Sequence, residues 1–233
     1  MTVRERLDEL AARYRLGPEA AGQLELILGL VAAEPAAITS IRNPGRAVEL
    51  HVADSLTGLE LDEVRRARRL ADLGSGGGFP GLVLAVALPE SRVNLVESVG
   101  RKCVFLERAA AAAGLHNVRV AQARAEDWPA QAELSDLVTA RALAPLPVLL
   151  EYAAPLLELG GALVAWKGRR DPSEEADANA AARVLGMSTP RPVPVEPPRG
   201  ADERTLYLSS KLSPTPPQYP RRAGIARKRR IRA

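Results

Sequence analysis

A glycine-rich stretch behind a carboxylate offers the clearest chemistry in the sequence. "DLGSGGGFPG" begins at Asp72 and holds five glycines in ten positions. Two ligand-binding patterns overlap in it. Gly76, Gly78 and Gly81 fit the dinucleotide pattern G-x-G-x-x-G, whereas Asp72, Gly74 and Gly76 fit the pattern D-x-G-x-G. The patterns alone do not decide between the two ligands.

The charge of Asp72 favours the second pattern. A dinucleotide loop cradles a pyrophosphate anion, which a carboxylate at the end of the preceding strand would repel. S-adenosyl-L-methionine instead presents a cationic ammonium and a cationic sulfonium. We therefore interpret the stretch as the loop that binds this cofactor, with Gly74, Gly76 and Gly78 allowing close approach of the main chain and Phe79 lying against the ligand. An NAD-dependent oxidoreductase stays as the alternative.

Two further acidic residues follow the next two expected strands. Glu97 ends the second strand, where a carboxylate accepts the hydroxyls of a ribose. After the third strand, the main chain at Ala125 and the carboxylate of Glu126 are placed to bind adenine. Each acid alone could be a helix cap or a surface charge. Their order after successive strands predicts a cofactor site.

Alternating strand and helix patterns predict an α/β fold with a doubly wound, Rossmann-like sheet. An apolar stripe at Val3, Leu7, Leu10 and Tyr14 opens the chain as a helix. We expect seven strands, the last one antiparallel, with the final apolar run at 204–211 as an edge strand. The expected strands and helices of the core are 69–74, 80–88, 92–98, 99–114, 117–122, 135–142, 146–159, 160–168 and 171–185. The division that follows is 1–58 (N-terminal helices and a substrate lid), 59–211 (core) and 212–233 (tail).

Composition narrows the class of protein. One cysteine and two histidines among 233 residues predict neither disulfides nor a metal site. The charged N-terminus does not resemble a secretory signal, and no apolar run is long enough to span a membrane. We expect a cytoplasmic, metal-free monomer.

The basic charge of the chain is concentrated in its tail. Residues 212–233 hold seven of the 32 Lys and Arg and none of the 28 Asp and Glu, so residues 1–211 carry 25 − 28 = −3. Pro-rich and without apolar periodicity, the tail predicts a disordered arm that contacts RNA phosphates. A solvated terminus without that role is the alternative. Removal of residues 221–233 is then expected to weaken RNA affinity and leave cofactor affinity unchanged. The basic residues proposed to bind RNA are Arg221, Arg222, Arg227 and Lys228.

Seven segments together resemble a known family. In chain order they read "ITSIRNP", "HVADSL", "DLGSGGGFPG", "ESVGRKCVFLE", "RAEDW", "TARALAPLPVLLEYAAPLLELGGALVAWKG" and "ERTLYLSSK". From about residue 36 to 211 the chain is similar to the bacterial 16S rRNA guanine-N7 methyltransferases, once called glucose-inhibited division protein B. The resemblance implies a class I methyltransferase fold and methylation of N7 of guanine 527 in 16S rRNA, as naked rRNA or in the small ribosomal subunit. It also implies cofactor contacts at Gly74, Phe79, Ala125, Glu126 and Arg141.

The residues agree with chemistry at N7. Guanine N7 carries a lone pair and no proton, so its methylation needs alignment and electrostatics but no base. Cys103 lies on an apolar helical stripe and is interpreted as a core residue, not a nucleophile. Arg141, after the fourth strand, is the expected catalytic residue, donating to the cofactor or to guanine O6. An ion pair of Arg141 with Glu97 or Glu126 is the alternative.

Further polar residues are expected at the substrate. Arg42, Asn43, His51 and Asp54 belong to the predicted lid, and Lys167 follows the fifth strand, where it could contact an rRNA phosphate. For His51 the alternative is a structural hydrogen bond to Asp54 or to the backbone, and for Lys167 a surface position. Three other functions stay open: methylation of another rRNA base, methylation of a small molecule, and RNA binding without catalysis.

Overall fold

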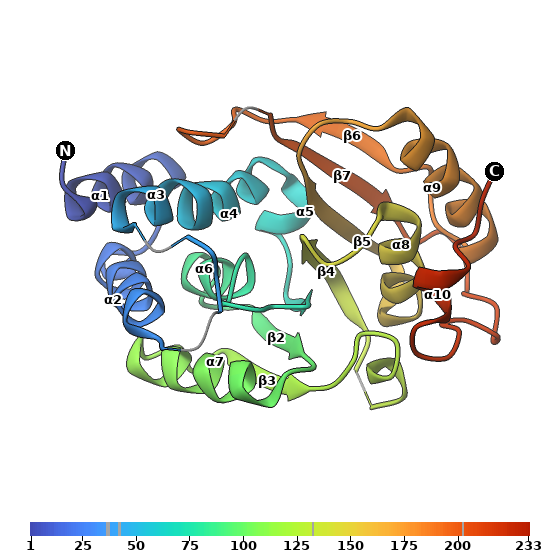
Figure 1. The fold of residues 1–233 in the computed structure, drawn as a ribbon, viewed down its shortest axis with the longest axis horizontal. Coiled ribbons are helices and arrows are strands. Elements are labelled where there is room, and N and C mark those ends of the chain that lie inside the picture. Colours follow the sequence, from blue (N-terminus) through green and yellow to red (C-terminus); the bar gives the residue numbers. More distant parts are fainter. Residues whose placement is uncertain (36–37, 42, 132, 202) are drawn as a thin grey trace.

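A seven-stranded sheet forms the centre of the computed structural model, which describes residues 1–35, 38–41, 43–131, 133–201 and 203–233 (Figure 1). The strand order is β3-β2-β1-β4-β5-β7-β6. Strands β1 to β5 are parallel, and β7 is antiparallel to both of its neighbours. The strands are β1 (Arg69–Leu73), β2 (Arg92–Glu97), β3 (Val118–Gln122), β4 (Ser135–Arg141), β5 (Leu157–Lys167), β6 (Arg191–Pro194) and β7 (Thr205–Ser210).

This sheet confirms the predicted α/β class and the antiparallel last strand. The expected edge position of that strand is wrong, because β7 lies between β5 and β6. The proline-rich β6 forms the edge instead. Proline lacks the N–H that a central strand must donate to its neighbours, so only an outer position accepts the "RPVP" run.

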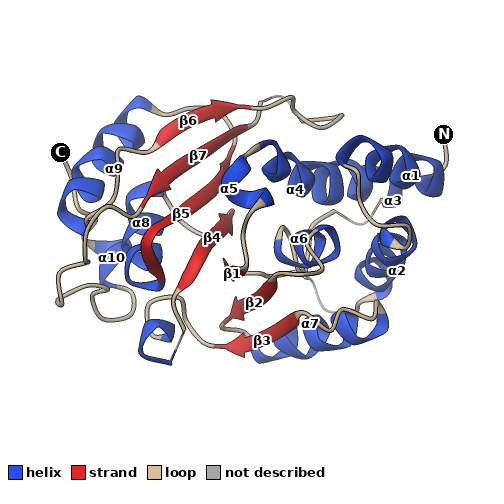
Figure 2. Cartoon of the chain, turned by 180° about the vertical axis from the view of Figure 1, so that it is seen from behind, coloured by secondary structure: helices blue, strands red, loops and turns tan. Residues whose placement is uncertain are grey.

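Helices cover both faces of the sheet (Figure 2). The order β3-β2-β1-β4-β5 reverses direction between β1 and β4, which is the switch point where ligands bind in doubly wound sheets. The α-helices are α1 (Val3–Tyr14), α2 (Ala20–Ala33), α3 (Pro44–Ala47), α4 (Asp54–Leu56), α5 (Asp62–Arg65), α6 (Gly81–Ala87), α7 (Gly100–Ala112), α8 (Leu146–Ala153), α9 (Pro172–Leu185) and α10 (Ile225–Lys228). A π-helical stretch, Val48–Ala53, joins α3 to α4.

Alternating side chains of the strands enter two apolar clusters, one on each face. On the first face, α6 and α7 pack with the N-terminal helices, and the predicted stripe of α1 is buried in the same cluster at Leu7, Leu10 and Tyr14. The helices α8 and α9 supply the second cluster. The N-terminal segment therefore shares a core with the sheet. Cys103 is buried, as expected for a core residue.

The C-terminal residues 212–233 differ from the expected disordered arm. They pack against the second face, and Ala226 in α10 is buried in its apolar cluster. The Arg221 guanidinium forms an ion pair with Glu151 of α8, whose side chain is buried. Glu151 lies 70 residues earlier in the chain. Apolar periodicity could not reveal this ion pair, because it joins two charged residues 70 positions apart in the chain.

None of the helices in the described part of the chain is long and apolar enough to cross a membrane.

Candidate active site

A cavity of about 460 Å³ opens at the switch point, beyond the carboxyl ends of β1, β2 and β4. It brings together five of the predicted cofactor residues: Gly74, Gly76, Glu97, Ala125 and Glu126. We call it the cofactor cavity. Lining residues that the sequence analysis did not single out include Lys102, Arg124, Ala142, Leu143, Tyr152 and Gly224.

The glycine loop takes a backbone shape that other residues adopt poorly. Gly74 has φ +67°, and a Cβ there would lie 2.6 Å from Leu143 Cδ1. Glu97 fixes the loop, because its carboxylate accepts the N–H of Gly76 at 3.0 Å and that of Val99 at 2.9 Å. Glu97 thus joins the loop after β1 to the start of α7 while it lines the cofactor cavity.

Asp72 lies beneath the loop and not on the cavity surface. Its side chain is fully buried, and it accepts hydrogen bonds from Thr139 Oγ1 at 2.8 Å and from the N–H of Gly81 at 3.3 Å. Burial raises the pKa of Asp72 to about 6, although the hydrogen bond from Thr139 acts in the opposite direction and lowers it. Its expected position facing the sulfonium needs correction: the geometry assigns it to holding the turn between β1 and α6.

Two other residues of the stretch also lie apart from the cofactor cavity. Gly78 has φ +95° and packs close to Leu82. The Phe79 ring is buried and stacks on the His51 imidazole, with ring centroids 4.3 Å apart and planes 8° from parallel. Phe79 thus contacts the lid residue His51 in this structure, and its predicted contact with the ligand stays a prediction.

A second cavity of about 450 Å³ lies beside the first, and Ala142 lines both. We call it the substrate-side cavity. Ala142 has φ +55°, a strained conformation for a residue with a Cβ. Such strain is found where function fixes the backbone. Residues lining this cavity include Thr39, Ser40, His51, Asp54, Arg141, Lys167 and Arg204.

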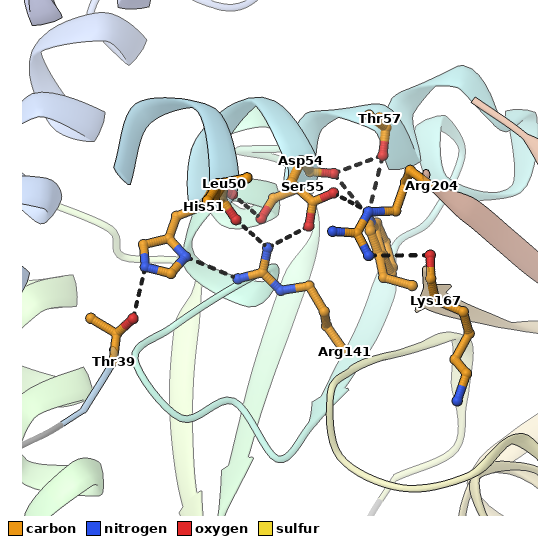
Figure 3. A network of polar contacts seen from close by, with 10 residues as sticks. Thr39, Leu50, His51, Asp54, Ser55, Thr57, Arg141, Lys167 and Arg204 are labelled. Carbon is orange, nitrogen blue, oxygen red and sulfur yellow. Dashed lines mark hydrogen bonds and ion pairs between the residues drawn. The ribbon is translucent and has the colours of Figure 1, made fainter. Parts of the chain in front are cut away.

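A buried carboxylate organises the substrate-side cavity (Figure 3). Asp54 Oδ2 accepts from Arg141 Nη1 at 2.7 Å, and Asp54 Oδ1 lies 2.5 Å from Arg204 Nε. The second contact is an ion pair without hydrogen-bond alignment. One carboxylate thus faces two guanidiniums, which leaves a net positive charge at the cavity wall.

Arg141 is held on the lid side of the site. Its Nη1 also donates to the carbonyl oxygen of Leu50 at 3.0 Å, in the π-helical stretch. Neither Glu97 nor Glu126 forms the ion pair considered as the alternative; Asp54 takes that place. Burial lowers the pKa of Arg141, and the Asp54 carboxylate opposes this shift. Within the described part of the chain, Nε and one N–H of Nη2 have no partner, so they can donate to a ligand.

The hydrogen bonds of His51 define its tautomer. Arg141 Nη2 lies 3.4 Å from Nδ1, and Thr39 Oγ1 lies 3.0 Å from Nε2. Because arginine only donates, Nδ1 accepts and the proton is on Nε2, which donates to Thr39. Burial and the charge of Arg141 lower the pKa of His51 to about 4. Thr39 takes the place of the expected Asp54 partner.

This neutral histidine predicts a pH-dependent loss of stability. The unfolded chain takes up a proton at His51 near pH 6.5, whereas the folded chain does so only near pH 4. Stability is therefore lost as the pH falls through this window. Between pH 7 and pH 4, urea unfolding should show wild type losing up to about 3 kcal/mol relative to His51→Gln.

Asp72 has a raised pKa, so its contribution to stability increases as the pH falls, opposite to that of His51. This contribution is the same in wild type and in His51→Gln, and it cancels in the comparison. His116→Gln, at an exposed position, is the control and should run parallel to wild type. A difference between wild type and His51→Gln that stays constant with pH would contradict the assignment.

The other predicted substrate residues have separate positions. Asn43 caps α3, because its Oδ1 accepts the N–H of Arg46 at 3.0 Å. Lys167 lines the substrate-side cavity, but its Nζ pairs with Glu174 at 2.6 Å. Arg42 lies outside the described residues. Asn43 Oδ1 and Lys167 Nζ thus each have one partner within the protein, while the Asn43 amide N–H groups and the other ammonium N–H groups keep the capacity to donate to a ligand, so their role at the substrate stays a prediction.

In the substrate-side cavity, the sequence analysis missed the charged residue Arg204. It directly precedes β7, and Thr205 pairs with Lys167 at the end of β5. Because β7 is antiparallel, its beginning lies at the same edge as the carboxyl ends of the parallel strands. A basic residue just before an antiparallel strand was the available signal.

In the described part of the chain, no group of His, Cys, Asp and Glu could hold a metal ion.

Comparison with known proteins identifies the family. A family model described as rRNA small subunit methyltransferase G matches residues 27–195. The Ribosomal RNA small subunit methyltransferase G of Rubrobacter xylanophilus is 42% identical over 214 residues, which are 89% of this chain and 82% of that protein.

Two solved structures share the fold. An O-methyltransferase from Bacillus cereus in complex with SAH gives a TM-score of 0.56 at 18% identity, over 81% of this chain and 90% of that chain. Aeropyrum pernix fibrillarin with natively bound S-adenosyl-L-methionine gives 0.53 at 17% identity, over 67% and 73%. The sheet is thus that of class I methyltransferases, and the matched sequence shows that the chain belongs to the rRNA small subunit methyltransferase G family.

Proposed function

We propose that this chain transfers the methyl group of S-adenosyl-L-methionine to N7 of guanine 527 in 16S rRNA. The observation that carries this proposal is the pair of cavities that meet at Ala142. A methyl donor in one and a base in the other would face each other across a single strained residue. The family membership supports an rRNA substrate.

The residues present fit the cofactor. Its ribose hydroxyls and exocyclic amine are donors, and the cofactor cavity offers the carboxylates of Glu97 and Glu126 as acceptors. A Cβ at Gly74 would collide with Leu143 in the cavity wall, and Gly76 has φ +55°, so the loop needs glycine at both positions. When bound, the cofactor supplies an electrophilic methyl group, while the chain binds and orients it.

A substitution at Gly74 tests this fit. In Gly74→Ala the new Cβ meets Leu143 in the wall of the cofactor cavity, so S-adenosylhomocysteine affinity should fall by roughly tenfold or more. The matched control is Gly114→Ala, where φ is +66° and nothing lies within 4 Å of the added Cβ.

Both variants carry the strain of the left-handed conformation, about 1–2 kcal/mol. Only Gly74→Ala should change the dissociation constant measured by titration calorimetry. An equal loss of affinity in both variants would mean that backbone strain lowers the affinity. It would contradict the proposed effect of the contact between the new Cβ and Leu143.

The polar groups of the substrate-side cavity favour an acceptor atom that carries no proton. Both ring nitrogens of His51 are engaged, and the Asp54 carboxylate faces two guanidiniums. Neither is placed to remove a proton from a substrate. Guanine N7 needs no such removal, and the remaining N–H donors of Arg141 suit the neighbouring O6. Arg141 is therefore proposed as the residue that orients the base.

The test maps the modified base directly. Small-subunit rRNA from cells with and without the gene is treated with borohydride and aniline, which cleave at N7-methylguanine. The expected result is cleavage at guanine 527 only when the gene is present. Identical cleavage in both samples would overturn the site of methylation. Methylation of purified small subunits and of metabolite extracts distinguishes the remaining alternatives, another rRNA base and a small molecule.

A further inference from the structure

A buried ion pair pins the C-terminal end of the chain to α8. The N–H and the guanidinium of Arg221 both bind the Glu151 carboxylate, through four hydrogen bonds of 2.5–3.2 Å. The Glu151 side chain is 1% exposed and that of Arg221 is 25% exposed. Loss of the guanidinium would leave a buried carboxylate without a counter-charge, so this pair fixes the segment strongly. Arg221 is thereby engaged within the protein, in contrast to its expected contact with RNA.

Beyond this anchor the chain reaches the cofactor cavity. The N–H of Gly224 donates to Glu126 Oε1 at 3.0 Å, and Arg227 Nη2 donates to the carbonyl oxygen of Leu143 at 2.8 Å. Gly224 and Arg227 line the same cavity as Gly74 and Glu97. The segment therefore contacts the cavity on two sides, at the residue after β3 expected to bind adenine and at the loop after β4.

The local conformation fits this position. Gly224 has φ +80°, which turns the chain toward Glu126, and the next helix buries Ala226 to 1% exposure. Glu126 keeps its Oε2 without a hydrogen-bond partner in the described part of the chain. A carboxylate accepts several hydrogen bonds, so the segment and a ligand can share Glu126.

We infer that residues 219–228 complete the cofactor cavity, with Gly224 and Arg227 as its outer wall and the Arg221–Glu151 pair as its anchor. The inference rests on the proposed function, because it takes the ligand of this cavity to be an adenosyl amino acid. It replaces the expectation that the tail affects RNA affinity alone. Arg222, Lys228, Arg229, Arg230 and Arg232 have no polar side-chain contact in the described part of the chain and stay available for RNA.

The experiment measures binding of S-adenosylhomocysteine to the full-length protein by titration calorimetry. In Gly224→Pro the N–H that binds Glu126 is absent and φ +80° is not accessible, so affinity should fall by roughly tenfold. Arg221→Gln should give a similar loss by releasing the anchor. Arg230→Gln removes the same charge from an exposed position and should bind like wild type.

A second measurement keeps the test independent of any folding defect. Binding is reciprocal, so S-adenosylhomocysteine should slow hydrogen exchange of the amides of residues 221–228 in wild type. Unchanged affinity in Gly224→Pro together with unchanged exchange would overturn the role of the segment and leave the proposed function standing. Tighter binding in Gly224→Pro would instead identify the segment as a plug that competes with the ligand. Failure of wild type to bind S-adenosylhomocysteine would overturn the cofactor assignment, and this inference with it.

Discussion

Replacement of Arg141 by glutamine should slow methylation of the small-subunit rRNA by about 10²–10³-fold at saturating cofactor and RNA. The guanidinium lies between the lid and Ala142, the residue shared by the two cavities. Its remaining N–H groups are the proposed donors to guanine O6, and glutamine cannot reproduce their planar arrangement. Because Arg141 does not line the cofactor cavity, affinity for S-adenosylhomocysteine should stay within a few-fold of wild type.

Two further variants separate geometry from charge. Arg141→Lys keeps the positive charge and loses the planar fork, so it should be nearly as slow as Arg141→Gln. Arg66→Gln, at a side chain that is 79% exposed, is the control and should methylate at the wild-type rate. Single-turnover kinetics on purified small subunits supply the rates. If Arg141→Lys methylated at nearly the wild-type rate, the proposed planar hydrogen bonds of Arg141 would be refuted. Only the positive charge of the residue would then contribute to the reaction.

Replacement of Asp54 by asparagine should destabilise the protein by about 3–5 kcal/mol, since it leaves buried charge without compensation. Asp54 is fully buried between Arg141 and Arg204, whose side chains are only 13% and 17% exposed. Asparagine keeps the shape and removes the negative charge, so two adjacent guanidiniums would face each other in a medium of low dielectric constant.

Urea unfolding of Asp54→Asn and Asp62→Asn tests this expectation. Asp62 also pairs with an arginine, Arg66, but at 71% and 79% exposure. Water screens that pair, so its loss should cost less than about 1 kcal/mol. If Asp54→Asn lost equally little free energy of unfolding, its negative charge would not be what joins the lid to β4 and β7.

Local patterns in the sequence were enough to predict the sheet and five of the residues that line the cofactor cavity. Parallel strands end at one edge, so Gly74 after β1, Glu97 at the end of β2 and Glu126 after β3 had to lie close together once the strands were recognised. Their prediction needed only strand boundaries and chain order. The position of Arg141 at the end of β4 followed in the same way.

The partners of these residues could not be predicted in that manner. Asp54 pairs with Arg141 and Arg204, which lie 87 and 150 residues later in the chain, and Glu151 pairs with Arg221, which lies 70 residues later. No periodic pattern in the sequence indicates any of these ion pairs. Asp72 sits beneath the loop instead of facing the ligand because the closely packed turn buries its side chain.

The sequence by itself therefore determined the order of strands and helices and the edge of the sheet at which ligands bind, because these depend on local periodicity and on residues next to strand ends. Only the tertiary structure decided which charges pair, which faces of Phe79 and His51 meet, and where the C-terminal segment lies. Those choices depend on burial, which strengthens a few long-range ion pairs and hydrogen bonds that a linear pattern does not encode.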